Sequence, residues 1–354
     1  MNIQNENEKI EVIVVPELLK IKTQSFLASN FCHHTFNHFA NHLVDILNNT
    51  DYTKTRLSGE FDVVKDIKRP DDWNKYGLYL INPEANKIYF ERKLLGNTIK
   101  LLYKDEGDTF RLTCNKKYYN WIRFTIGGGL FPPGLILQNI VTVKLLERSY
   151  VPIHCAAISK DGEAIILPAP PDTGKTTTVL SALETGFNFV SEEVAVVDSE
   201  CNIYSCPLTA TYAKYLSGRR DRLYSAIAEK IPIFPFFVKQ PTSNIINFLR
   251  KIKIDKKAKI GYIALLERGE SEVLEANKDI VLQKILAMNR AEFPFYHDPL
   301  LSAYSYFNTT LDLHKIVIQE KKIISSIVDK VKCFVIKSKN PKEYINLLID
   351  ALKI

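Results

Sequence analysis

Residues 163–183 read EAIILPAPPDTGKTTTVLSAL, and this stretch decides the fold of the second half of the chain. The apolar run of residues 164–167 predicts a buried strand, and the apolar spacing of residues 178–183 predicts a helix. Between them lies the tripeptide Gly-Lys-Thr of residues 174–176, in the strand–loop–helix context of a phosphate-binding P-loop. Free N–H groups at a helix start, with the positive end of the helix dipole, favour an anion there.

The loop predicts a site for the triphosphate of ATP and for Mg²⁺. The ammonium group of Lys175 can reach the β- and γ-phosphates, and the hydroxyl of Thr176 can ligate the metal. The residues expected to bind the nucleotide are consecutive: Asp172, Thr173, Gly174, Lys175, Thr176 and Thr177.

Two features of this loop depart from the usual pattern G-x-x-x-x-G-K-[ST]. Ala169 stands in the place of the first glycine, and Pro170 and Pro171 each remove one backbone N–H group from the loop. The alternative reading is therefore an ordinary strand-to-helix turn, or a degenerate loop that no longer binds phosphate.

Length and composition are those of an ordinary globular protein. The chain has 354 residues, of which 46% are apolar and 25% charged, enough for two domains or one large one. The formal net charge of +7 suits an anionic ligand or an acidic partner, but it is too small to indicate nucleic-acid binding.

Cysteine spacing and hydropathy indicate the cellular compartment in which the protein is expected. The six cysteines include no C-x-x-C pair, which favours reduced thiols over a disulfide framework. The polar N-terminus does not have the pattern of a signal peptide, and no apolar stretch is long enough to span a bilayer. We therefore expect a cytoplasmic protein that binds neither a membrane nor nucleic acid.

We expect residues 1–116 to form a smaller, mixed α/β domain, and substrate recognition is the candidate role for it. Its predicted strands are residues 10–15, 78–81, 87–90 and 98–103. A helix predicted over residues 31–48 carries His34, His38 and His42 at four-residue spacing, on one helical face. Such a spacing can chelate a metal, but we favour the interpretation that these histidines form a partly buried polar face.

Residues 117–354 are expected to form the larger domain. Gly127-Gly128-Gly129 predicts a flexible joint rather than a second phosphate site, because no strand–GxGxxG–helix frame surrounds it. An apolar helix is expected over residues 135–148 and an amphipathic one over 341–354. The other predicted elements are strands at residues 151–158, 187–190, 194–198, 203–205, 260–266 and 333–336 and a helix at residues 278–288.

Two basic segments have open interpretations. Residues 251–259 contain five lysines, and a solvated loop or face is the favoured reading of such a run. Arg219, Arg220 and Arg222 lie in a predicted helix and are candidate contacts to substrate or phosphate.

The order of several motifs resembles that of a known family. The motifs are His154-Cys155-Ala156-Ala157-Ile158, a hairpin at Gly162, Gly174-Lys175-Thr176, Glu184-Thr185-Gly186-Phe187 and Val190-Ser191-Glu192-Glu193. Together they resemble the HPr kinase/phosphorylase family, and more closely the HPr kinase-related enzymes of peptide-modification gene clusters. The resemblance covers about residues 117–200. It implies an α/β P-loop kinase domain similar to the nucleotide domain of phosphoenolpyruvate carboxykinase.

The resemblance also implies roles for individual residues. His154 matches a histidine near the reacting phosphate, and Lys175 and Thr176 match the phosphate lysine and the Mg²⁺-binding hydroxyl. Glu192 and Glu193 match an acidic pair that is usually Asp-Asp, the first taken as the base for the acceptor hydroxyl and the second as a metal ligand. The expected catalytic residues are thus His154, Lys175 and Glu192, and the expected metal ligands are Thr176 and Glu193. A structural alternative exists for each assignment. His154 can be a core histidine whose hydrogen bonds are all made, and Glu192 and Glu193 can be the solvent-exposed end of a strand.

These expectations describe an ATP-dependent kinase that transfers the γ-phosphoryl group to a Ser/Thr hydroxyl of a protein, a peptide or a small molecule. Two alternatives remain open. One is a catalytically degenerate scaffold that binds nucleotide, and the other is a simple NTPase. The resemblance also makes a homo-oligomer plausible.

Overall fold

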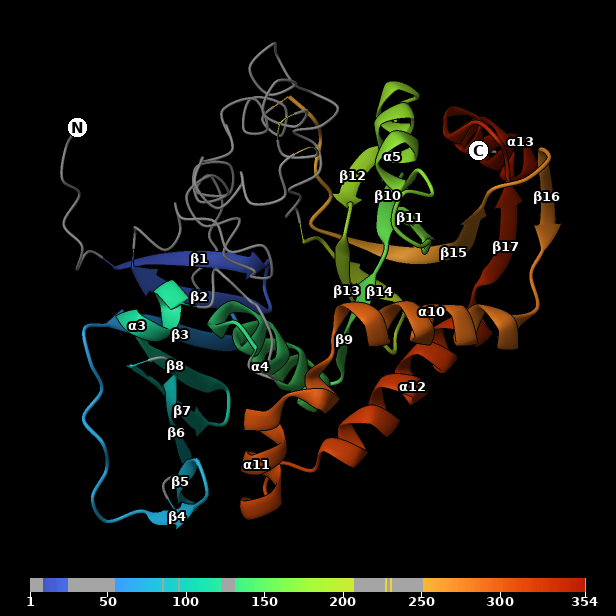
Figure 1. Ribbon diagram of the computed structural model, residues 1–354. Helices are drawn as coiled ribbons and strands as arrows, with labels where there is room; N and C mark the ends of the chain where they lie inside the picture. Colours follow the sequence, from blue (N-terminus) through green and yellow to red (C-terminus); the bar gives the residue numbers. More distant parts are fainter. Residues whose placement is uncertain are drawn as a thin grey trace. The chain divides into compact units, whose positions relative to one another are not determined.

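The computed structural model describes residues 9–24, 55–121 apart from 85 and 95, 131–206, 227, 230 and 251–353. Within these residues the chain is a mixed α/β protein with two mixed sheets (Figure 1), and the expected fold class is confirmed at this level. The chain divides into two compact units, residues 1–147 with 293–318 and residues 148–292 with 319–354.

The division into compact units differs from the expected boundary at residues 116 and 117. The helix α4 (Pro133–Glu147) belongs to the first unit, and residues 293–318 return to that unit from far along the chain. The expected boundary is a statement about independently folding domains, and it stays a prediction. The histidine helix of residues 31–48, Gly127-Gly128-Gly129 and the three arginines 219, 220 and 222 lie outside the described residues.

The first unit is built on a sheet with the described strand order β1-β2-β3-β8-β7-β6-β5-β4. The neighbours β2, β3 and β8 are parallel, and the other neighbours are antiparallel. The strands are β1 (Lys9–Val15), β2 (Leu19–Gln24), β3 (Leu57–Val64), β4 (Asn74–Tyr76), β5 (Tyr79–Asn82), β6 (Lys87–Leu94), β7 (Asn97–Glu106) and β8 (Thr109–Asn115). The strands predicted in this region are confirmed.

The helices of the first unit are α3 (Lys116–Trp121), α4, the short 3₁₀ helix η3 (Phe295–His297) and α11 (Pro299–Phe307). α4 is buried along almost its whole length, including Lys144. The ammonium group of Lys144 lies 2.6 Å from the carboxylate of Asp105 and 2.9 Å from that of Glu147. A buried lysine needs such partners, because an unpaired charge is very costly inside a protein.

Asp298 joins α11 to α4 within the first unit. One oxygen of its fully buried carboxylate accepts hydrogen bonds from the N–H groups of Leu300 and Leu301, which caps α11. The other oxygen accepts a hydrogen bond of 2.9 Å from the side-chain amide of Asn139 on α4. Burial raises the pKa of Asp298 to about 6 although these hydrogen bonds oppose the rise.

The second unit is built on a sheet with the described strand order β12-β10-β11-β15-β14-β13-β9, with β17 beside β15 and β16 beside β17. β15 pairs in parallel with β11 and with β17. Parallel neighbours need long crossover connections, which here contain helices. The strands are β9 (Tyr150–His154), β10 (Ala156–Lys160), β11 (Glu163–Leu167), β12 (Asn188–Ser191), β13 (Val194–Asp198), β14 (Asn202–Tyr204), β15 (Lys257–Glu267), β16 (Glu272–Glu275) and β17 (Lys332–Lys337).

A change of pairing partner at Cys155 divides the strand predicted over residues 151–158. β9 pairs with β13, whereas β10 pairs with β11 and β12. Glu192 and Glu193 connect β12 to β13, and this connection lies beside Cys155, whose N–H donates to the carbonyl of Glu193. His154, Glu192 and Glu193 therefore lie close together, because the β9–β10 and β12–β13 connections are neighbours.

The helices of the second unit are α5 (Lys175–Glu184), α10 (Lys278–Glu292) and α13 (Tyr344–Leu352), the last preceded by the short η4 (Pro341–Glu343). A further helix, α12 (Leu313–Lys330), contains the point where the chain passes from the first unit to the second. α5 and α13 bury their apolar sides in one core with the strands, which includes Val179, Phe189, Leu266, Ile345 and Leu348. No helix among the described residues is long and apolar enough to cross a membrane.

Replacement of Leu348 by alanine tests this core. Leu348 is 1% exposed, so Leu348→Ala should lower the free energy of unfolding by about 2–5 kcal/mol through lost burial and a cavity. Asn346→Ala, an exposed position on the same helix, should change it by less than about 0.5 kcal/mol. Denaturant unfolding measures both, and equal stability of the two variants would contradict this packing of α13.

Replacement of Asp298 by asparagine tests the buried cap through its pH dependence. The folded protein binds a proton at Asp298 more tightly than the unfolded chain does, since its pKa is raised from 3.8 to about 6. Stability from this group is therefore present at acidic pH and is lost as the pH rises from about 4 to 6, by roughly 3 kcal/mol at most.

Asp298→Asn should lack that component of the pH dependence and be the more stable protein at pH 8. The new amide can be accommodated when the side-chain amide of Asn139 turns over, because Asn139 now donates to this oxygen and its own side-chain oxygen is buried without a hydrogen-bond partner. After that turn the oxygen of Asn139 accepts from the new NH₂ group. The measurement is unfolding free energy against pH for both proteins. Parallel curves would show that Asp298 titrates as it does in the unfolded chain.

Candidate functional site

The loop between β11 and α5 makes the strand–loop–helix turn that the sequence predicts. Gly174 has φ +117° and ends the loop directly before α5. A Cβ at this position would lie 2.5 Å from the side chain of Pro341, so both the backbone angle and the space require glycine. Gly174, the residue at the N-cap of α5, makes no side-chain capping hydrogen bond, and the start of the helix therefore suits an anion.

Lys175 is buried and turned back into the loop. Its ammonium group donates to the carbonyl oxygens of Ala169 at 2.8 Å and Pro170 at 3.3 Å. It also lies 3.3 Å from Nε2 of His154. An ammonium group can only donate, so Nε2 of His154 accepts and the proton of the neutral ring is on Nδ1.

Thr176 and Glu192 form the second contact of the site. The hydroxyl of Thr176 donates to the carboxylate of Glu192, which is completely buried. The sequence-based expectation paired Thr176 with Glu193 instead. Glu192 directly follows β12, so the first acid of the pair reaches the helix start and the second acid does not.

Glu193 faces His154. Its carboxylate lies 3.8 Å from Nδ1 of His154, and the carboxylate of Glu292 lies 3.7 Å from the same atom. Both distances are too long for hydrogen bonds, and Nδ1 is buried without a hydrogen-bond partner. The side chain of Glu193 is 34% exposed, so it can be reached from outside, unlike that of Glu192.

Burial sets the protonation of this cluster. It lowers the pKa of His154 to about 4, with help from the positive charge of Lys175. It raises the pKa of Glu193 to about 7, with help from the negative charges of Glu192 and Glu292 and against that of Lys175. At neutral pH the ring of His154 is therefore uncharged.

α10 supplies two residues that sequence reasoning missed, Asn289 and Glu292. The side chain of Asn289 is fully buried, accepts from the N–H of His154 and donates to the carbonyl of Pro152 and to Glu320, each at 3.0 Å. The predicted helix ended at residue 288, one turn early. The sequence did contain a signal for Asn289. It follows Val281 and Ile285 at four-residue spacing on the buried side of the helix, where a polar side chain needs hydrogen-bond partners.

The remaining expected nucleotide residues lie in the loop and at the start of α5. Asp172 is exposed, adopts a positive φ of 59° and accepts a hydrogen bond at its carbonyl from Arg268. Thr173 is buried, and Thr177 is half-buried at the start of α5. All six consecutive residues thus lie at the turn, and among them Thr176 donates a hydrogen bond to the first residue of the acidic pair.

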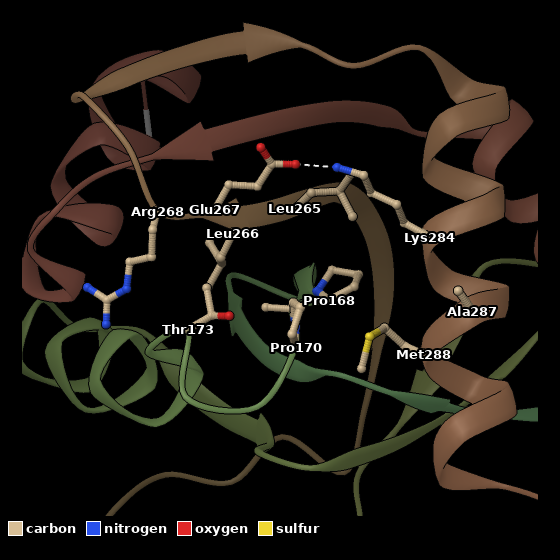
Figure 2. A pocket seen from close by; sticks show the side chains of 11 residues that line it. Pro168, Pro170, Thr173, Leu265, Leu266, Glu267, Arg268, Lys284, Ala287 and Met288 are labelled. Atoms are coloured by element: carbon tan, nitrogen blue, oxygen red, sulfur yellow. Dashed lines mark hydrogen bonds and ion pairs between the residues drawn. The ribbon is translucent and has the colours of Figure 1, made fainter.

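A cavity of about 360 Å³ lies beside the loop within the second unit. Residues from three segments line it: the loop at Pro168–Pro170, the end of β15 and one side of α10 (Figure 2). Thr173 lines it as well. The same helix therefore borders the cavity and holds His154.

A magnesium ion would find suitable donors at Thr176 and Glu192. Hydroxyl and carboxylate oxygens are the hard ligands that Mg²⁺ prefers, and it usually takes only one or two carboxylates and completes its shell with water and phosphate. The part of the chain that the structure describes contains no cluster of three or more histidine, cysteine or acidic side chains able to hold a metal by themselves. Such a cluster is typical of transition-metal sites rather than of magnesium–nucleotide sites.

Comparison with known proteins does not identify a family. No protein-family model matches the chain, and no curated protein matches it. The expected family therefore rests on the motifs quoted above.

Replacement of Asn289 tests how α10 positions the site. Asn289→Ala should remove three buried hydrogen bonds and leave their partners unsatisfied, at a cost of about 2–4 kcal/mol in unfolding free energy. Gln283→Ala, at an exposed position of the same helix, is the matched control and should be near neutral. If both variants were equally stable, Asn289 would not connect α10 to β9.

Proposed function

We propose that this protein is an ATP-dependent phosphotransferase that moves the γ-phosphoryl group to a Ser/Thr hydroxyl of a protein, a peptide or a small molecule. One observation carries the proposal. Lys175, Thr176, Glu192, Glu193 and His154 come together at the start of a helix whose first N–H groups have no side-chain cap. Phosphoryl transfer needs this combination of phosphate positioning, charge neutralisation and an acid–base group.

The second unit would accordingly be a P-loop kinase domain of the HPr kinase type. Support comes from the motif order in the sequence and from the parallel neighbours β11 and β15 beside the loop. In this proposal the N–H groups of α5 and the ammonium group of Lys175 bind the β- and γ-phosphates. Phosphate oxygens would replace the carbonyls of Ala169 and Pro170 as the partners of Lys175.

Thr176 and Glu192 would hold Mg²⁺. This ion would supply neutralisation of the charge that develops during transfer. Glu192 suits this position because its carboxylate already contacts the Thr176 hydroxyl and is closed to bulk solvent.

Glu193 would accept the proton of the acceptor hydroxyl. This assignment exchanges the roles that the resemblance implies for the two acids, and it follows from contact and exposure. Glu193 can be reached by an acceptor, whereas Glu192 is 0% exposed. In the step, the acceptor oxygen bonds to the γ-phosphorus, the bond to the bridging oxygen breaks, ADP leaves and the hydroxyl proton passes to Glu193.

His154 would be a positioning residue in this arrangement. Its neutral ring lies between Lys175 and Glu193, and it separates a positive from a negative group that would otherwise pair directly. An unpaired Glu193 is the more effective proton acceptor, because a close ammonium group lowers the basicity of a carboxylate.

A scaffold or simple NTPase remains the second candidate, and the loop itself favours it. Pro168, Pro170 and Pro171 provide no N–H group, so the loop offers fewer phosphate donors than the usual P-loop. Nucleotide binding without transfer would identify the scaffold, and phosphate release without any acceptor would identify the NTPase.

The test is phosphate incorporation from labelled ATP with Mg²⁺ into serine- and threonine-containing peptides and small alcohols. Lys175→Ala should abolish it. Glu193→Gln should reduce the transfer rate about 10²–10⁴-fold while ATP binding and the magnesium requirement stay unchanged. Glu192→Gln should instead raise the magnesium concentration needed for half-maximal rate.

Unfolding curves control for the integrity of each variant. Equal incorporation by the wild type and Lys175→Ala would refute the kinase proposal. If Glu193→Gln changed the magnesium requirement and Glu192→Gln did not, the order of roles implied by the resemblance would be the correct one.

A further inference from the structure

The cavity beside the loop has the chemistry of a site for a flat, mostly apolar ring. Pro168 and Ala169 on the loop, Leu266 at the end of β15 and Ala287 and Met288 on α10 contribute apolar surface to its lining. Figure 2 shows Met288 on α10 and Pro168 on the loop extending into the space between these two segments. The volume of about 360 Å³ is within the usual range for small-molecule sites.

Two of the prolines that weaken the loop as a phosphate site, Pro168 and Pro170, line this cavity. A glycine at position 168 or 170 would offer no side-chain surface, whereas a pyrrolidine ring offers a rigid apolar face. Pro168 is buried and Pro170 is exposed at the rim. The loop therefore presents N–H groups at its α5 end and apolar surface at its β11 end.

One edge of the cavity is polar. The ammonium group of Lys284 on α10 pairs with the carboxylate of Glu267 at the end of β15, and both side chains are partly exposed. Figure 2 draws this pair along one side of the lining. Arg268 also borders the cavity, but its guanidinium donates to the carbonyls of Asp172 and Lys339 and so ties down the loop.

We propose that this cavity binds the purine base and ribose of the nucleotide whose phosphates lie at the start of α5. The inference rests on the proposed function. α10 joins the two places, since Lys284 and Met288 line the cavity and Asn289 holds the backbone of His154. A single extended ligand can therefore lie along the loop, with its base at the cavity and its last phosphate near Lys175.

The polar edge matches the edge of a purine. Glu267 accepts a hydrogen bond from a ring or exocyclic N–H, and Lys284 donates one to a ring nitrogen or a carbonyl oxygen. Adenine and guanine each carry such a neighbouring donor and acceptor. Both also cover more apolar surface than a one-ring pyrimidine does, which favours them in this lining.

The experiment compares ATP with inorganic tripolyphosphate by calorimetry, in the presence of Mg²⁺. Ala287→Phe fills the cavity from α10, at an exposed position that should tolerate the change. This variant should bind ATP about tenfold or more weakly and bind tripolyphosphate as the wild type does. Gln283→Phe adds the same ring one turn away, outside the lining, and should bind both as the wild type does.

Adenosine and guanosine provide a readout that needs no variant. In the wild type each should compete with ATP, although neither carries phosphate, and uridine should compete at least several-fold less. Lys284→Met should narrow this difference between purine and pyrimidine, because it removes the donor at the polar edge.

The possible failures can be told apart. If ATP and tripolyphosphate both failed to bind the wild type, the proposed function and this inference would fall together. If tripolyphosphate bound and Ala287→Phe left ATP affinity unchanged, the phosphate site would stand and the base would lie elsewhere. Equal competition by purine and pyrimidine nucleosides would likewise overturn the assignment to purines.

Discussion

The arrangement of the site depends on the backbone turn at Gly174. Its φ of +117° and the side chain of Pro341, 2.5 Å from where a Cβ would lie, mean that any other residue there would be strained and would displace Pro341. This turn carries the chain from the buried strand β11 directly into α5. As a result Lys175 opens the helix and folds back into the loop, while Thr176, one residue later, meets the carboxylate of Glu192.

The ammonium group of Lys175 is the positive charge at the centre of a buried cluster of titratable side chains. Lys175 is 6% exposed and Glu192 is 0% exposed, in an environment where unpaired charges are costly. The positive charge of Lys175 helps to hold His154 neutral and opposes the rise in the pKa of Glu193. Removal from water is nevertheless the larger cause of both shifts, so the packing of β9, β12 and α10 sets the protonation of the cluster more than any single ion pair does.

α10 connects the parts of the second unit that matter for binding and for chemistry. Its buried period, Val281, Ile285 and Asn289, packs inward, and Asn289 exchanges hydrogen bonds with β9 and with Glu320 of α12. Its other side borders the cavity beside the loop. A displacement of this helix would change the cavity and the backbone of His154 together, because the same rigid element touches both.

The sequence alone was sufficient to predict the elements that depend on neighbouring residues in the chain. The apolar run of β11, the turn at Gly174 and the periods of α4, α5 and α13 were predictable, because each depends on residues that are close neighbours in the chain. The mixed α/β class followed from the same patterns.

Tertiary structure alone decided which acid meets Thr176, since the position of the chain at Cys155 depends on how the five strands β9 to β13 pair. It also decided that Asn289 and Glu292 reach His154 across more than a hundred residues, a contact that no local pattern encodes because packing between distant segments creates it.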